Sequence, residues 1–154
     1  MISEAITDLS DISRSMSSEL ILNNGLIKAL EFETAQLKKS GLYLIKFSVT
    51  GNSSFLDTHI ELVLFRIVQE ALNNIIKHST ATVITINLDY TNDLLTLDIV
   101  DNGRGFSFGK NCERGAGLNN MKQRANTLNG QLTINSQPGI GTEIKIEIPI
   151  HEQN

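Results

Sequence analysis

The chain of 154 residues is 40% hydrophobic and 19% charged, a composition that fits one globular domain with its own core. Its net charge of −4 and its lack of tryptophan argue against the basic, base-stacking surfaces of nucleic-acid-binding proteins. A single cysteine, Cys112, excludes an internal disulfide framework and suits a reducing compartment.

The first 40 residues are predicted to be helical in two parts. Apolar residues recur at steps of three and four over 2–21, which predicts an amphipathic helix with a narrow apolar stripe. A break at 23–25 precedes a second helix that runs up to Gly41, a residue typical of helix C-caps. The narrow stripe fits a helical partner, such as a second copy of the chain, as well as it fits packing onto the chain's own domain.

A strand and a long helix are expected next. Apolar and polar residues alternate from 42 to 50, which predicts a strand. Thr58 and Glu61 have the spacing of a capping box, with Asp57 as a second cap candidate. The apolar residues that follow keep a helical period to about Lys77. Four residues at steps of three and four form one polar stripe near the end of this helix: Glu70, Asn73, Asn74 and Lys77.

The second half of the chain alternates between strands and loops around a short helix. Alternation predicts strands over 83–90 and 94–100, joined by a short hairpin link. Residues 103–117 are rich in glycine and lack periodicity, so a mobile loop is expected there. The remaining predicted elements are a helix over 118–128, strands over 132–134 and 144–148, and a turn over 136–139 between those strands.

This order of elements predicts a two-layer α/β sandwich. Strands joined by short links pair antiparallel, so we expect a mixed, mainly antiparallel sheet with helices covering one face. The expected organisation is a helical segment over 1–40, a domain over 41–150 and a polar tail over 151–154.

A carboxylate and two glycines end the strand at 94–100. Asp101 is expected at the edge of the core, where burying a carboxylate is costly unless a hydrogen-bond donor satisfies it. Gly103 and Gly105 would let the backbone take positive φ values and approach a ligand closely. We interpret residues 101–106 as a ligand-recognition turn, and the alternative is an ordinary surface turn.

The polar stripe on the long helix offers oxygen ligands and a cation. Mg²⁺ prefers oxygen ligands and usually shares the phosphates of its substrate, so one amide oxygen of the stripe could suffice. The commoner alternative for such a stripe is a solvated helix face. The loop over 103–117 carries three basic residues and one acid and leads into a helix N-terminus, a structure that binds phosphate.

Other common sites are absent from the sequence. There is no P-loop motif, and the GxG at Gly115 lacks both the preceding strand and the third glycine of a Rossmann fingerprint. The three histidines His59, His78 and His151 show no metal-site spacing with Cys112 or with each other.

Four motifs in order resemble those of the GHKL ATPase superfamily. Residues 70–78 resemble the N box, 101–105 the G1 box, 115–118 the G2 box and 139–142 the terminal GxGT. Residues 66–72 and 117–125 are most similar to sensor histidine kinases of the NarL/DesK-type branch. The resemblance implies the Bergerat fold and a catalytic ATP-binding domain that uses ATP and Mg²⁺.

The resemblance also implies a role for each matching residue. Asn74 would ligate Mg²⁺, and Glu70 would occupy the water-orienting catalytic position. Asp101 would bind the adenine amine, supported by Thr142 directly or through a water. The other residues implied to bind ATP are Lys77, His78, Gly103, Gly105, Gly115, Gly117 and Leu118.

The phosphoacceptor histidine of such kinases is not evident in this sequence. Residues 2–21 resemble the second helix of a dimerisation bundle, whose first helix would carry that histidine. The partners implied are therefore this bundle, a second copy of the full-length kinase and a response regulator, with no nucleic acid. A cytoplasmic location is implied for this domain, and the sequence leaves open whether the full-length protein is membrane-anchored.

The sequence leaves three functions open. The first is transfer of the ATP γ-phosphate to a histidine. The second is an anti-sigma-factor-type serine kinase of the same superfamily, which the N-terminal helical pair argues against. The third is a non-catalytic interaction module in which the glycine-rich stretch is only a linker.

Overall fold

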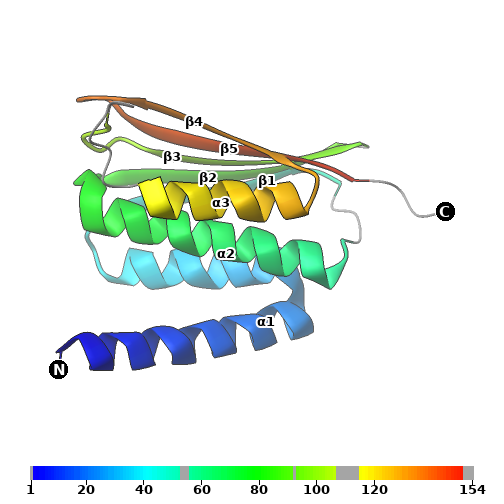
Figure 1. Cartoon of the computed structure of the whole chain (residues 1–154), viewed down its shortest axis with the longest axis horizontal. Coiled ribbons are helices and arrows are strands. Elements are labelled where there is room, and N and C mark those ends of the chain that lie inside the picture. The colour runs from blue at the N-terminus through cyan, green and yellow to red at the C-terminus, as the bar shows by residue number, and fades with distance from the viewer. Residues whose placement is uncertain (1, 53–55, 92, 107–114, 151–154) are drawn as a thin grey trace.

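The computed structural model describes residues 2–52, 56–91, 93–106 and 115–150. Figure 1 shows a sheet with helices packed against one of its faces. The predicted two-layer α/β sandwich is therefore confirmed. The expected tail over 151–154 and most of the expected mobile loop lie outside the described residues.

The sheet has five strands in the order β1-β2-β3-β5-β4. Only β1 and β2 pair in parallel, and the other three neighbouring pairs are antiparallel. The parallel pair follows from the long helix between β1 and β2, because parallel neighbours need a crossover connection. The strands are β1 (Leu44–Gly51), β2 (Val83–Tyr90), β3 (Leu94–Asp101), β4 (Gln131–Gln137) and β5 (Gly141–Pro149).

The helices are α1 (Ile2–Lys39), α2 (Thr58–Asn74), a π-helical turn η1 (Ile75–Ser79) and α3 (Gly115–Thr127). The predicted break in the first helix is confirmed, because α1 is kinked at Gly25, whose φ and ψ are 84° and 173°. At the start of α2, the Asp57 side chain accepts the His59 N–H at 3.3 Å. Asp57 is therefore the cap, in place of the capping box expected at Thr58.

One core joins the two layers. It contains Ile84, Ile86 and Leu88 of β2 and Leu64, Ile67 and Val68 of α2, all of them fully buried. The second half of α1 contributes Leu26, Ala29 and Leu30 to the same core. The alternating burial along β2 and β3 confirms the period of two read from the sequence. No helix in the described part of the chain is long and apolar enough to cross a membrane.

A carboxylate from α2 holds the kink in α1. The Leu26 N–H, directly after the kink at Gly25, donates to Glu61 Oε2 at 3.2 Å. Burial raises the pKa of Glu61, although the Leu26 hydrogen bond acts in the opposite direction. Burial, together with the charge of Glu61, also raises the pKa of Tyr90 to about 12.

The sheet face away from the helices carries a poorly satisfied carboxylate, Asp98 of β3. One of its oxygens is buried and has no hydrogen-bond partner within the described residues. Burial raises the pKa of Asp98, the nearby Lys145 lowers it, and Glu143, Glu147 and Asp89 raise it further. Ionised Asp98 therefore opposes folding.

The Asp98→Asn variant is expected to be modestly more stable than the wild type at neutral pH, because it removes a charge that folding desolvates. The gain is modest because Asp98 is only half-buried and water screens its charge. Since the folded-state pKa is raised, the advantage should shrink as the pH falls toward the ordinary carboxyl value of 3.8. Urea unfolding midpoints measured from pH 8 down to pH 4 test this, and an advantage that does not change with pH contradicts it.

Candidate functional site

The end of the sheet next to η1 carries a row of aligned residues. Asp101 of β3 is in register with Ile84 of β2 and with Thr142 of β5, and Thr142 is in register with Ser136 of β4. The alternation of burial places Ile84 and Asp101 on the face that packs against the helices. Asp101 is only 6% exposed and is the one acidic residue that is buried within the described part of the chain.

The turn after Asp101 folds back on that carboxylate. The Gly103 N–H donates to Asp101 Oδ1 at 2.8 Å. The next residue, Arg104, donates its N–H to the Ser79 carbonyl at 2.7 Å. Asn102 locks the other side of the turn, because its Oδ1 accepts the N–H groups of Thr82 and Val83 at 2.9 Å each. One Asp101 oxygen is thus held by its own turn.

The two glycines of the turn make room for the protein's own backbone. A Cβ on Gly103 would lie 2.2 Å from the Ser79 carbonyl oxygen, and a Cβ on Gly105 would lie 2.1 Å from that of Gln137. The expected positive φ occurs at Gly105, at 62°, but not at Gly103. That part of the expectation was wrong, and Gly103 is required by the close approach to Ser79 and to the Asp101 carboxylate.

Lys77 and His78 lie in η1 and not in a continuous α-helix as predicted. The α-helical geometry ends at Asn74, and the π-helical turn covers the next five residues. Lys77 is exposed and His78 is half-buried. The buried Ser79 closes the turn, because its hydroxyl donates to the Ile75 carbonyl at 3.0 Å. Turns of this kind occur frequently at functional sites.

The N-terminal turn of α3 packs against the polar stripe of α2. A Cβ on Gly117 would lie 3.1 Å from Glu70 Oε1 and 3.5 Å from Asn74 Nδ2. The helix begins at Gly115, three residues earlier than predicted. Leu118, at 8% exposure, belongs to the core. Glu70, Asn74 and the start of α3 are therefore brought together, whereas Asn73 is exposed on the same helix.

Ser136 joins the row at a position where the sequence predicted a turn. Strand β4 extends to Gln137, so Ser136 is paired within the sheet. Its Oγ lies 2.8 Å from Thr142 Oγ1 and accepts the Phe106 N–H at 2.8 Å. It also donates to the Gly141 carbonyl at 3.2 Å. A serine in a Ser-Gln-Pro-Gly string resembles a turn residue, so its sequence gave no sign of this role.

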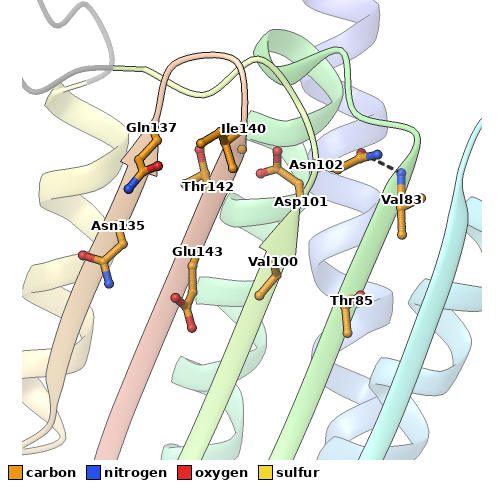
Figure 2. Close-up of a pocket in the computed structure, with 11 residues that line it drawn as sticks. Val83, Thr85, Val100, Asp101, Asn102, Asn135, Gln137, Ile140, Thr142 and Glu143 are labelled. Atoms are coloured by element: carbon orange, nitrogen blue, oxygen red, sulfur yellow. Dashed lines mark hydrogen bonds between the residues drawn. The ribbon is translucent and has the colours of Figure 1, made fainter.

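A cavity of about 390 Å³ opens at the same strand ends but on the other face of the sheet. Figure 2 views this cavity with the helices behind the sheet, and the side chains of Asp101 and Thr142 lie toward one another across β3 and β5. Asp101 and Thr142 line it together with Val100 and Glu143, whereas Glu70 and Asn74 do not. The cavity therefore does not bring Asp101 and Thr142 together with Glu70 and Asn74. On the helix-facing side of the sheet, the turn after Asp101 contacts Ser79, and η1 connects Ser79 to Asn74.

This helix-facing region has two chemically different ends. The Asp101 end offers acceptors, a carboxylate and a threonine hydroxyl, to a ligand that carries donors. The other end offers the Asn74 amide, the Glu70 carboxylate, the cation of Lys77 and the N-terminus of α3, a combination that suits phosphates and a hard cation. Within the described ranges no three His, Cys, Asp or Glu side chains cluster as a metal cage.

The family described as "Histidine kinase-, DNA gyrase B-, and HSP90-like ATPase" matches residues 59–152. The chain is 32% identical over 163 residues to the signal transduction histidine-protein kinase/phosphatase DegS of Brevibacillus brevis, covering 97% of this chain and 42% of that protein. It is 43% identical over 91 residues to the sensor histidine kinase LiaS of Bacillus subtilis, covering 59% of this chain and 25% of that protein. The chain thus spans less than half the length of these relatives.

Solved structures share the fold. The blue-light activated histidine kinase of Erythrobacter litoralis EL346 superimposes with a TM-score of 0.70 at 19% identity, covering 96% of this chain and 51% of that one. The histidine kinase AdeS of Acinetobacter baumannii superimposes with a TM-score of 0.67 at 16% identity, covering 96% and 81%. At these identities the likeness supports the fold alone.

Proposed function

This chain belongs to the family of histidine kinase-, DNA gyrase B- and HSP90-like ATPases, and from that premise we propose that it is the ATP-binding catalytic domain of a sensor histidine kinase of the NarL/DesK-type branch. The relatives DegS and LiaS carry the words histidine kinase in their names. The reaction is transfer of the γ-phosphate of Mg-ATP to a histidine on a helical dimerisation bundle, from which a response regulator then receives it.

One observation carries the proposal. The start of α3 packs on Glu70 and Asn74, and the η1 turn connects Asn74 to Ser79, which contacts the turn that follows Asp101. The short η1 segment therefore connects the Asp101 end, which is rich in hydrogen-bond acceptors, to the Asn74 end, where the phosphates are proposed to bind. ATP matches this arrangement, because its base carries an exocyclic amine and its other end carries the phosphates.

At the base end, Asp101 accepts a hydrogen bond from the adenine amine, and Thr142 supports it directly or through a water. Guanine is disfavoured there, because its 6-position is a carbonyl and not a donor. Gly103 and Gly105 keep the turn close to Ser79 and Gln137, which leaves the space beside Asp101 to the nucleotide.

At the phosphate end, the Asn74 amide oxygen would be the protein's ligand for Mg²⁺, a cation that prefers oxygen ligands and usually shares the phosphates of its substrate. Bound Mg²⁺ supplies charge neutralisation at the phosphates. Lys77 and His78 lie near the phosphates, and the backbone N–H groups of Gly115, Gly117 and Leu118 bind them at the start of α3. Glu70 takes the water-orienting or base position, within reach of the same turn.

The segment over 1–40 belongs to the helical part of the kinase. The portion before Gly25 corresponds to the second helix of the dimerisation bundle, and the portion after it is a connection that packs on the domain over 41–150. The domain lies in the cytoplasm, and the full-length kinase acts as a dimer.

Mixing the chain with the histidine-bearing bundle of the same kinase and γ-labelled ATP tests the reaction class. We expect acid-labile, base-stable label on the bundle. Label on serine of a partner protein would instead support the serine-kinase alternative, and calorimetry that detects neither Mg-ATP nor Mg-ADP binding would support a non-catalytic module.

Asn74→Ala is expected to remove the dependence of ATP binding on Mg²⁺, because the variant lacks the one amide oxygen that the protein offers to the cation. ATP affinity measured by calorimetry with Mg²⁺ and with EDTA tests this. Asn73→Ala, one residue earlier and exposed, is the matched control and should keep the dependence. An Asn74→Ala protein that still binds ATP more tightly with Mg²⁺ means that another residue holds the metal.

A further inference from the structure

We propose that Ser136 is a positioning residue that determines base specificity by fixing the direction of the Thr142 hydroxyl. Ser136 need not touch the nucleotide, because it acts through Thr142, its neighbour across β4 and β5. The inference rests on the proposed nucleotide site and adds a residue and a specificity mechanism to it.

Three neighbours surround the Ser136 hydroxyl. The Phe106 N–H, at 2.8 Å, can only donate. The Gly141 carbonyl, at 3.2 Å, can only accept. The Thr142 hydroxyl, at 2.8 Å, can do either. A serine hydroxyl has one proton to donate and two lone pairs that can accept.

We assign the direction of the third hydrogen bond from this count. With the Ser136 proton donated to the Gly141 carbonyl, its two lone pairs receive the Phe106 N–H and the Thr142 O–H. The single proton of Thr142 is thereby directed to Ser136. The lone pairs of Thr142 remain, and Thr142 is in register with Asp101 on the neighbouring strand.

The result is a pair of acceptors at the base end of the site. Asp101 as a carboxylate accepts only, and Thr142 held in this way also accepts only. Two adjacent acceptors favour a 6-amino purine, directly or through a water, and oppose a 6-oxo purine, which would bring a third acceptor. Without Ser136 the Thr142 hydroxyl could rotate and donate its proton to the oxygen of a 6-oxo purine.

The same hydroxyl also fixes the loop that follows Asp101. Phe106 ends the described part of the turn that begins at Asp101, and its N–H is held by Ser136. Ser136 thus contacts both the Thr142 hydroxyl and the turn that follows Asp101.

The test measures ADP and IDP affinity by calorimetry in wild type and Ser136→Ala. The two nucleotides differ only along one edge of the base, where ADP has a 6-amine and an unprotonated N1 and IDP has a 6-carbonyl and an N1–H, so their affinity ratio reports on recognition of this edge. We expect ADP binding to weaken about threefold to tenfold, the range for one neutral hydrogen bond, and IDP binding to change less. The preference for ADP should therefore shrink. Ser136→Thr keeps the hydroxyl and is expected to restore the preference.

A double-mutant cycle separates positioning from general stability. Because Ser136 acts through Thr142, Thr142→Val should reduce the ADP preference, and adding Ser136→Ala to it should reduce the preference no further. If Ser136→Ala does not fold, Thr142→Val alone must still reduce the preference.

Two outcomes would overturn the inference: an unchanged ADP-to-IDP ratio in folded Ser136→Ala, or effects of the two substitutions that simply add. Either result is compatible with the proposed function, provided that the wild type binds ADP. A wild type that binds no nucleotide refutes the proposed function and this inference with it.

Discussion

Replacing Asp101 by asparagine is expected to weaken ADP binding by about 1.5–3 kcal/mol, roughly ten-fold to a hundred-fold, which is the value of a hydrogen bond to a charged group. The geometry explains why so conservative a change is severe. Asp101 Oδ1 accepts the Gly103 N–H, so asparagine keeps its oxygen on that donor and turns its amide nitrogen toward the ligand. A donor then faces the adenine amine, which also donates. Calorimetry with ADP measures the loss.

Asp98→Asn is the matched control for this prediction. Asp98 lies three residues earlier on the same strand and on the opposite face of the sheet, and its substitution changes the net charge by the same amount. ADP affinity should be unchanged in that variant. Equal ADP affinities for Asp101→Asn and the wild type would refute the assignment of Asp101 to the base.

Gly141→Ala is expected to be the most destabilising of the substitutions considered, at about 3 kcal/mol or more. Gly141 has a φ of 142°, and a Cβ there would lie 2.0 Å from the Asp101 carbonyl oxygen. Backbone strain of about 1–3 kcal/mol adds to an overpacking cost of about 1–3 kcal/mol, because the atom that must move is backbone. Urea unfolding measures the change in the free energy of unfolding.

Gly139→Ala separates the two costs. Gly139 lies in the same β4–β5 turn with a φ of 81°, but nothing lies within 4 Å of its added Cβ. Only the cost of a left-handed backbone remains, about 1–2 kcal/mol. If the two variants lose the same stability, contact with the Asp101 carbonyl does not restrict position 141.

The parts of the fold that sequence predicted well have strong periodic burial. β2 and β3 alternate strictly between buried residues and more accessible ones, and α2 repeats its buried residues with a helical period. These patterns are visible without knowing any neighbour, because one face of each element must be apolar. Asp101 was identifiable for a related reason: a carboxylate directly after a buried strand is unusual.

The parts that sequence missed depend on distant contacts. The π-helical turn at Ile75–Ser79 continues the apolar period of α2, and what distinguishes it is the fit of Ser79 against Gly103. Ser136 is a strand residue because β5 pairs with it, which overrides its local turn tendency. In both cases tertiary pairing, and not local propensity, decides the conformation.

The Glu61 contact at the kink of α1 has a mechanical consequence. Because Gly25 is non-helical and the next residue, Leu26, is hydrogen-bonded to Glu61, a rotation of the preceding helix about Gly25 would transmit force to the first turn of α2. Asn74 ends that same helix, thirteen residues and about 20 Å farther along at 1.5 Å per residue. We expect α2 to move as a rigid helix. A rotation at Gly25 would then change the position of Asn74, the residue proposed to hold Mg²⁺.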